Sequence, residues 1–122
     1  MEGMSDYLGH VFEDVCSEYF RQSYRNVGTW WGTDARRRTK EEIDIVAIGN
    51  GHMLLCECKY RSEPMGKNSL ETLLRRSTLV KNSLPKKLCA VSKTGFTEEA
   101  IKTALENEIT LYTMGDITLS NR

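Results

Sequence analysis

Two apolar segments joined by a short Asn-Gly turn constrain the fold of this chain most. Residues 41–48 read Glu-Glu-Ile-Asp-Ile-Val-Ala-Ile, and residues 53–60 read Met-Leu-Leu-Cys-Glu-Cys-Lys-Tyr. Between them stands Gly-Asn-Gly-His at 49–52, and an Asn-Gly pair flanked by strand-like segments is typical of a tight β-hairpin. The pattern predicts two adjacent antiparallel strands that are apolar enough to lie inside a sheet.

Apolar periodicity and capping residues predict the rest of the chain. Helices are expected over residues 4–25, 68–82 and 97–107, and further strands over residues 27–32, 87–92 and 109–113. Asn68 is the expected N-cap of the second helix and Thr97 that of the third. The order αβββαβαβ predicts an α/β fold, with a sheet flanked by helices, in a single domain over residues 1–122.

The charges cancel overall but are unevenly distributed. Seventeen basic and seventeen acidic residues give a net charge of zero, which by itself favours neither a nucleic acid nor a membrane partner. Residues 21–40 carry six bases and one acid, and residues 61–93 carry eight bases and two acids, so two basic stretches enclose the acidic hairpin.

The N-terminal sequence and the cysteines bear on the compartment. No apolar run is long enough to span a bilayer, and the polar N-terminus lacks the pattern of a signal peptide, so a cytoplasmic protein is expected. The four cysteines have no Cys-x-x-Cys spacing and are expected to be small buried side chains in a reducing compartment. They are Cys16, Cys56, Cys58 and Cys89.

Strand alternation gathers the candidate chemistry on the hairpin. Glu57 and Lys59 share one face of their strand, and Cys56 and Cys58 take the other face, which is suited to the core. Asp44 lies thirteen residues before Glu57, and a tight turn brings the two strands together. Two converging carboxylates repel each other, and a hard divalent cation such as Mg²⁺ relieves that repulsion. Lys59 could then position an attacking water or neutralise charge on a phosphate.

The spacing of these residues is also that of a known motif. Asp44, twelve intervening residues and Glu57-Cys58-Lys59 resemble the Asp…(Asp/Glu)-x-Lys motif of the PD-(D/E)XK nuclease superfamily, although Ile43 stands where that superfamily has a proline. The wider pattern is similar to the restriction-endonuclease-like domain of unknown function at the C-terminal end of archaeal-type ATPases. The blocks that carry it are Gly-His-Val-Phe-Glu at 9–13, Trp-Trp-Gly at 30–32, Glu-Ile-Asp-Ile-Val-Ala at 42–47, Glu-Cys-Lys at 57–59 and Ser-Lys-Thr-Gly-Phe-Thr at 92–97.

The resemblance implies a restriction-endonuclease-like fold with a mixed central sheet. It implies hydrolysis of DNA phosphodiester bonds with Mg²⁺, or Mn²⁺, as cofactor. Asp44 and Glu57 would be metal ligands, and Lys59 and Glu13 further catalytic residues, because the superfamily often places an extra acid on the first helix. The chain would be a free-standing domain or the C-terminal piece of a longer ATPase, and the expected partners are DNA and an ATPase domain in cis or in trans.

Structural interpretations of the same residues stay open. The acids and Lys59 could form a salt-bridge cluster in a non-catalytic module that docks on an ATPase domain. Glu42 could reach the metal, but a solvent-facing acid is favoured. One of Trp30 and Trp31 is expected in the core, and the other could stack on a base or pack on a neighbouring domain. Arginines 36–38 could contact phosphates or form a solvated turn.

Overall fold

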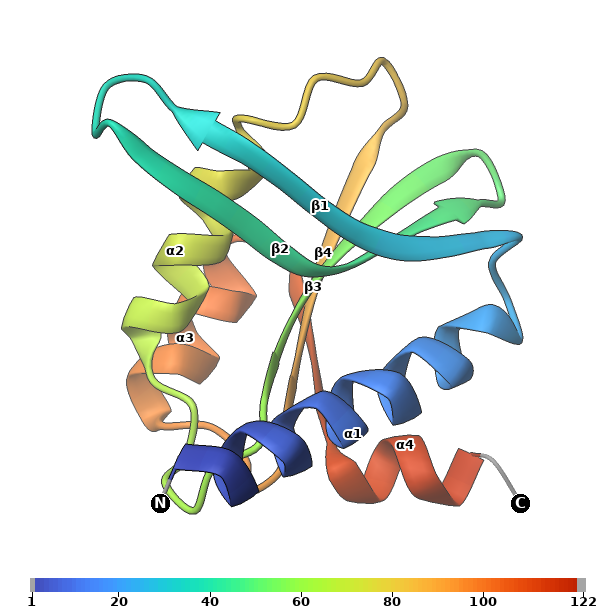
Figure 1. The fold of residues 1–122 in the computed structure, drawn as a ribbon, viewed down its shortest axis with the longest axis vertical. Helices are drawn as coiled ribbons and strands as arrows, with labels where there is room; N and C mark the ends of the chain where they lie inside the picture. The colour runs from blue at the N-terminus through green and yellow to red at the C-terminus, as the bar shows by residue number, and fades with distance from the viewer. Residues whose placement is uncertain (1, 121–122) are drawn as a thin grey trace.

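A five-stranded mixed sheet carries two helices on each face (Figure 1). The computed structural model describes residues 2–120, and the side chains of residues 6–118. The elements in chain order are α1 (Glu2–Arg21), β1 (Asn26–Asp34), β2 (Thr39–Gly49), β3 (His52–Lys59), α2 (Lys67–Ser77), β4 (Lys86–Ser92), α3 (Glu98–Glu106), β5 (Ile109–Thr113) and α4 (Met114–Ser120). No helix in this described part of the chain is long and apolar enough to cross a membrane.

The strands lie in their sequence order, β1-β2-β3-β4-β5. The first three pair antiparallel, while β3, β4 and β5 run parallel and are connected by α2 and α3. The α/β class and the flanking helices are therefore confirmed. Because β3 is the central strand, the side chains of residues 53–58 are all buried.

Each face of the sheet has its own apolar core. Phe12, Cys16 and Phe20 of α1 and Ile117 of α4 pack on one face, where Cys56 and Cys58 also point. The other face is covered by α2 and α3, whose buried side chains include Leu70, Leu73, Ala100 and Ala104. The expected split of β3 is thus confirmed, with its cysteines in the core beneath α1.

The Asn50–Gly51 turn sets the register of the central hairpin. Both residues have positive φ, 54° and 80°, which is the conformation of a type I′ turn and explains why Asn and Gly stand there. Gly49 pairs with His52, and the ladder continues to Ile45 opposite Cys56. The next pair along this register would be Asp44 and Glu57.

A bulge in β2 interrupts the sheet at this point. β1 advances two residues from Gly28 to Trp30 while β2 advances three from Val46 to Ile43, so β2 carries one extra residue around Asp44. As a result, Ile43 packs on the α2 face whereas Ile45 packs on the α1 face. The bulge lies where the β2–β3 ladder ends, since the last pair of that ladder is Ile45 with Cys56.

Three details of the predicted elements are wrong: the terminal helix, the cap of α2 and the end of α2. The predicted order αβββαβαβ lacks the terminal helix α4, because this helix is too short to show a periodic apolar pattern. The sequence signal for α4 is Thr113-x-x-Asp116, which forms a capping box. In this box Asp116 Oδ2 accepts a hydrogen bond from the Thr113 N–H. Asn68 does not cap α2, which follows extended Gly66 with no side-chain cap and ends at Ser77, earlier than residue 82. Thr97 does cap α3, accepting from the Ala100 N–H at 3.1 Å.

Candidate active site

Asp44 and Glu57 meet where the ladder between β2 and β3 ends. Beyond the last ladder pair, Ile45 and Cys56, the backbone N–H of Cys58 on β3 donates to a side chain of β2. Its acceptor is Asp44 Oδ2, at 2.9 Å. Glu57, on the neighbouring position of β3, is only 4% exposed, and its carboxyl group lies within hydrogen-bonding reach of Asp44. The two carboxylates that the sequence placed on the hairpin are therefore side by side.

The surroundings of Glu57 favour its neutral form. Burial, then the contact with Asp44 and the charge of Asp44, raise the pKa of Glu57 to about 8, against the opposing charges of Lys59 and Arg76. At neutral pH without a bound cation, Glu57 therefore stays largely protonated. A cation that replaced this proton would let both carboxylates ionise.

Two basic side chains flank Glu57. The ammonium of Lys59 lies 3.8 Å from Glu57 Oε2, on the face that strand alternation predicted. The guanidinium Nη1 of Arg76 lies 4.0 Å from the same oxygen. Sequence reasoning missed Arg76, since it comes from α2 and only the packing of that helix on the sheet brings it to the pair.

Glu13 approaches the pair from α1. Its side chain is half-buried, and its pKa is raised, first by burial and then by the charge of Asp44, with an opposing effect of His10. It thus lies near Asp44, and its catalytic role stays a prediction. Glu42 contributes more weakly to the same shift, but it is exposed and its Oε1 accepts the indole N–H of Trp31 at 2.7 Å. Glu42 therefore lies at the rim, as the favoured interpretation expected.

The donor set fits a magnesium ion better than a softer metal. Among the described residues, no group of three or more His, Cys, Asp or Glu side chains is arranged to hold a metal ion. The candidate is therefore a two-carboxylate site formed by Asp44 and Glu57. Mg²⁺ is commonly held by one or two carboxylates and keeps several waters, so a pair of this kind suits it. The metal and catalytic roles stay predictions.

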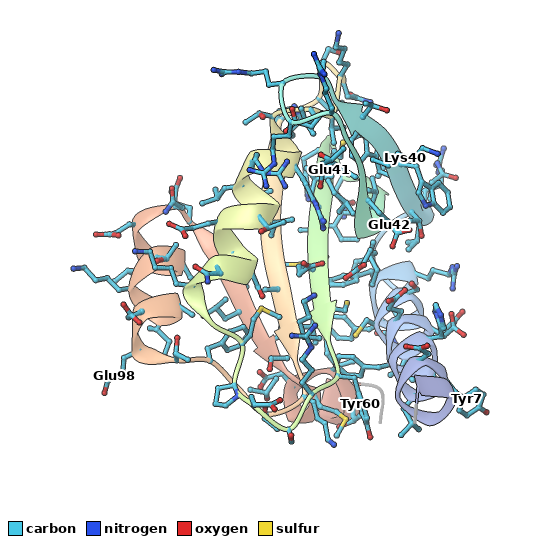
Figure 2. The ribbon with its side chains drawn as sticks, turned by 60° about the vertical axis from the view of Figure 1, so that its left-hand side comes forward. Tyr7, Lys40, Glu41, Glu42, Tyr60 and Glu98 are labelled. Carbon is cyan, nitrogen blue, oxygen red and sulfur yellow. The ribbon has the colours of Figure 1, made fainter. Side chains whose placement is uncertain are left out.

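A pocket of about 650 Å³ opens beside the pair, between α1 and the end of β3. Glu13 and Lys59 form part of its wall, together with Tyr60, Arg61 and Lys93. The Lys93 ammonium lies 4.3 Å from the centre of the Tyr60 ring, which is labelled at the lower end of β3 in Figure 2. Three cations and three acids, Asp6, Glu13 and Glu63, thus line this hollow, which reaches Cys58, the neighbour of Glu57 on β3.

A buried ion network fixes α2 against the hairpin. Glu41 accepts from Arg75 at 3.1 Å and from Arg76 Nε at 2.8 Å, and Arg75 also donates to Asp34 at 2.9 Å. Hydrogen bonds from Arg75, Thr39 and Arg76 lower the pKa of Glu41 to about 2. In Figure 2, Glu41 points toward α2, and Lys40 and Glu42 lie on the other side of β2. The network holds Arg76 in place beside Glu57.

The two tryptophans and the arginines of the β1–β2 turn lie as the sequence allowed. Trp30 is half-buried against the α2-side core, and Trp31 is 70% exposed. Arginines 36–38 are exposed, and the backbone N–H groups of Arg36 and Arg37 donate to Asp34. This turn is at the opposite end of β2 from its Asn50–Gly51 turn.

Solved structures share this fold. A protein of unknown function, AF1548, superposes with a TM-score of 0.63 at 23% identity over 89% of this chain and 58% of its own. VC1899 from Vibrio cholerae superposes with a TM-score of 0.62 at 15% identity, over 91% of this chain and 30% of its own. The MspJI restriction endonuclease, solved in complex with a 27-mer oligonucleotide, superposes with a TM-score of 0.54 at 11% identity. The match covers 88% of this chain and 26% of the MspJI chain. The chain thus has a restriction-endonuclease-like fold and spans less than two thirds of each of these proteins.

A family relationship covers the part of the chain that carries the site. No curated protein matches the sequence. Residues 1–77, more than half of the chain, match the family DUF234, described as archaea bacterial proteins of unknown function. The matched region contains Glu13, Asp44, Glu57, Lys59 and Arg76. The chain therefore belongs to the DUF234 family.

Proposed function

We propose that this chain is a magnesium-dependent phosphodiesterase of the PD-(D/E)XK superfamily that hydrolyses DNA. The observation that carries the proposal is the buried carboxyl group of Glu57 next to the half-buried Asp44, with the Lys59 ammonium 3.8 Å from Glu57. Burying an acid beside a second carboxylate is costly unless a cation is present in the working protein. The restriction-endonuclease-like fold supports the same conclusion by analogy.

Each residue has a distinct role in the proposed reaction. Asp44 and Glu57 would hold Mg²⁺, with Asp44 oriented by the Cys58 N–H. When bound, the ion supplies polarisation of a phosphoryl oxygen and a lower pKa for an attacking water. Lys59 positions that water and balances negative charge on the phosphate, and Glu13 can accept a proton from the α1 side.

The basic surfaces are suited to a phosphate backbone. Lys59, Arg61 and Lys93 line the pocket at the end of β3, together with the acids Asp6, Glu13 and Glu63. Arginines 36–38 are exposed in the turn before β2, and Arg38 lies six residues before Asp44, or about 20 Å in an extended strand. Cations at both places could contact phosphates on the two sides of the bond to be cleaved. MspJI, with a related fold, was solved with an oligonucleotide, which supports DNA as the substrate class.

Cleavage of a substrate panel tests the proposal. The protein is incubated with linear, branched and single-stranded DNA in Mg²⁺, in Mn²⁺ and in EDTA. We expect cleavage that requires the metal and falls at least 100-fold in Asp44→Asn, Glu57→Gln and Lys59→Met, whereas the exposed-acid control Glu106→Gln keeps wild-type activity. Cleavage that persists in EDTA or in Asp44→Asn would contradict the assigned site.

A non-catalytic module of a larger ATPase is the second candidate. It is favoured by α3, where Leu105 is 83% exposed and Ile101, one turn earlier, is 51% exposed. Such an apolar pair on an outward face suits docking on another domain. If no substrate in the panel is cleaved in either metal, and Leu105→Asp abolishes binding to an ATPase domain encoded with this chain, the second candidate replaces the first.

A further inference from the structure

Trp31 is a large aromatic side chain that the core does not use. It lies on the edge strand β1 and is 70% exposed, while its neighbour Trp30 supplies the packing against the α2-side core. Its indole ring is nevertheless oriented, because its N–H donates to Glu42 Oε1 at 2.7 Å. An exposed ring held by a hydrogen bond keeps one face open to solvent without losing its position.

The surroundings of Trp31 are polar. Trp31 pairs with Glu42 and Thr33 pairs with Lys40 across the β1–β2 ladder, so these four side chains share one face. Thr33, Lys40 and Glu42 are all exposed, and Figure 2 places Lys40 and Glu42 on the side of β2 away from Glu41. Protein-protein contacts usually bury a contiguous apolar patch at their centre, whereas the three side chains described here as sharing the face of Trp31 are all polar. A single aromatic plane among polar groups suits stacking on a nucleobase instead.

Trp31 also lies close to the candidate site. Its partner Glu42 is two residues from Asp44 on β2, a spacing of about 7 Å. The charge of Glu42 acts on Glu13 together with that of Asp44, so Glu42 and Asp44 approach the same region of α1. A base stacked on Trp31 would therefore belong to a nucleotide next to the phosphate at Asp44 and Glu57.

We propose that Trp31 is a stacking platform for an unpaired nucleobase beside the bond to be cleaved. The substrate class is then DNA with a single-stranded or extrahelical nucleotide at that position, since a base within an intact duplex has no free face to stack on the indole. The proposal rests on the proposed nuclease function for the bond, but the stacking itself is a binding property. Base–aromatic stacking tolerates any base, so little sequence preference is expected from this contact.

Tryptophan fluorescence with Ca²⁺ in place of Mg²⁺ tests the proposal in the absence of cleavage. The full chain is titrated with a single-stranded oligonucleotide and with a blunt duplex of the same sequence. In Trp30→Phe, which leaves Trp31 as the sole tryptophan, we expect the single strand to quench emission and the duplex to quench it much less. Trp31→Ala should bind the single strand about ten-fold or more weakly and the duplex unchanged, with Trp31→Phe recovering most of the affinity.

Salt dependence separates stacking from charge. Because a stacked base releases no counterions, Trp31→Ala should lower the affinity without changing the slope of log K against log salt. The proposal is overturned if the single strand does not quench Trp31, if Trp31→Ala binds it as tightly as wild type, or if Trp31→Ala instead changes the oligomeric state in sedimentation. Failure of the nuclease function looks different: quenching and the Trp31→Ala defect persist, but no DNA is cleaved in Mg²⁺. Absence of all DNA binding would overturn both.

Discussion

The stability of the metal-free protein should depend on pH through the buried carboxyl group of Glu57. Glu57 is 4% exposed, and burial and the neighbouring Asp44 raise its pKa from 4.5 to about 8. An acid with a higher pKa in the folded than in the unfolded protein binds more protons when folded, so the free energy of unfolding falls as the pH rises between the two values. We therefore expect the contribution of Glu57 to stability to be fully present below about pH 4.5 and to decline up to about pH 8.

The separation of the two pKa values sets the size of the decline. An interval of about 3.5 units, at about 1.36 kcal/mol per unit, gives an upper bound of about 5 kcal/mol. Movement of side chains and entry of water around an ionised Glu57 reduce this bound, so we expect a loss of about 2–4 kcal/mol. Glu13, whose pKa is also raised, acts in the same direction. Glu41 has a pKa of about 2, so its contribution is lost only as the pH falls below about 4.5, outside this window.

Urea unfolding in EDTA, followed by tryptophan fluorescence at several pH values from about 5 to 8, measures this decline. Glu57→Gln should remove most of it, because the amide does not ionise, whereas the exposed-acid control Glu106→Gln should keep it. Added Mg²⁺ should restore much of the stability lost near pH 8, since the ion replaces the proton that Glu57 holds at lower pH. A free energy of unfolding that stays flat or rises over this range, or an equal decline in Glu57→Gln, would refute the reasoning.

The other predictions concern the same pair and its surroundings. In EDTA near pH 8, Asp44→Asn should be as stable as wild type or more stable by about 1 kcal/mol, because the repulsion between the carboxylates of Asp44 and Glu57 is removed. Mg²⁺ should no longer raise the melting temperature of this variant. A marked loss of stability would instead favour a structural ion pair. Replacing arginines 36–38 by Glu should weaken DNA binding and leave the circular dichroism spectrum unchanged. The slope of log K against log salt should fall by roughly one unit for each phosphate that the turn no longer neutralises. An unchanged slope would show that the turn does not contact DNA. Glu41→Gln should cost about 2–4 kcal/mol in urea unfolding near pH 7, because the guanidinium groups of Arg75 and Arg76 lose a buried carboxylate, and a cost below about 0.5 kcal/mol would contradict the role given to the network.

Local sequence determined the geometry of the central hairpin. The Asn50–Gly51 turn requires two consecutive residues with positive φ, and this turn pairs Gly49 with His52. Counting away from the turn, one residue at a time along each strand, puts Asp44 opposite Glu57. Strand alternation with a period of two likewise separates Glu57 from its cysteine neighbours. These features depend only on residues close in sequence, and the sequence therefore predicted them.

The helix boundaries were less accessible to sequence reasoning. Thr97 was identified as a cap because its hydroxyl meets a backbone N–H three residues later, a local contact. Asn68 has the same chemistry but is not used, since the chain already enters α2 at Gly66. The seven-residue helix α4 is stabilised mainly by Ile117, which is fully buried, and a helix this short shows little periodicity.

Only the tertiary structure decided which cations meet the acids and where the tryptophans face. Arg76 reaches Glu57 across nineteen residues of sequence, and Glu41 binds two arginines more than thirty residues away. No periodic pattern encodes such contacts, because they depend on how α2 packs on the sheet. The bulge in β2 is likewise a property of the paired strands, and it changes the face on which every later side chain of β2 lies. Local sequence thus specified the acids and their register, and long-range packing specified the charges and surfaces around them.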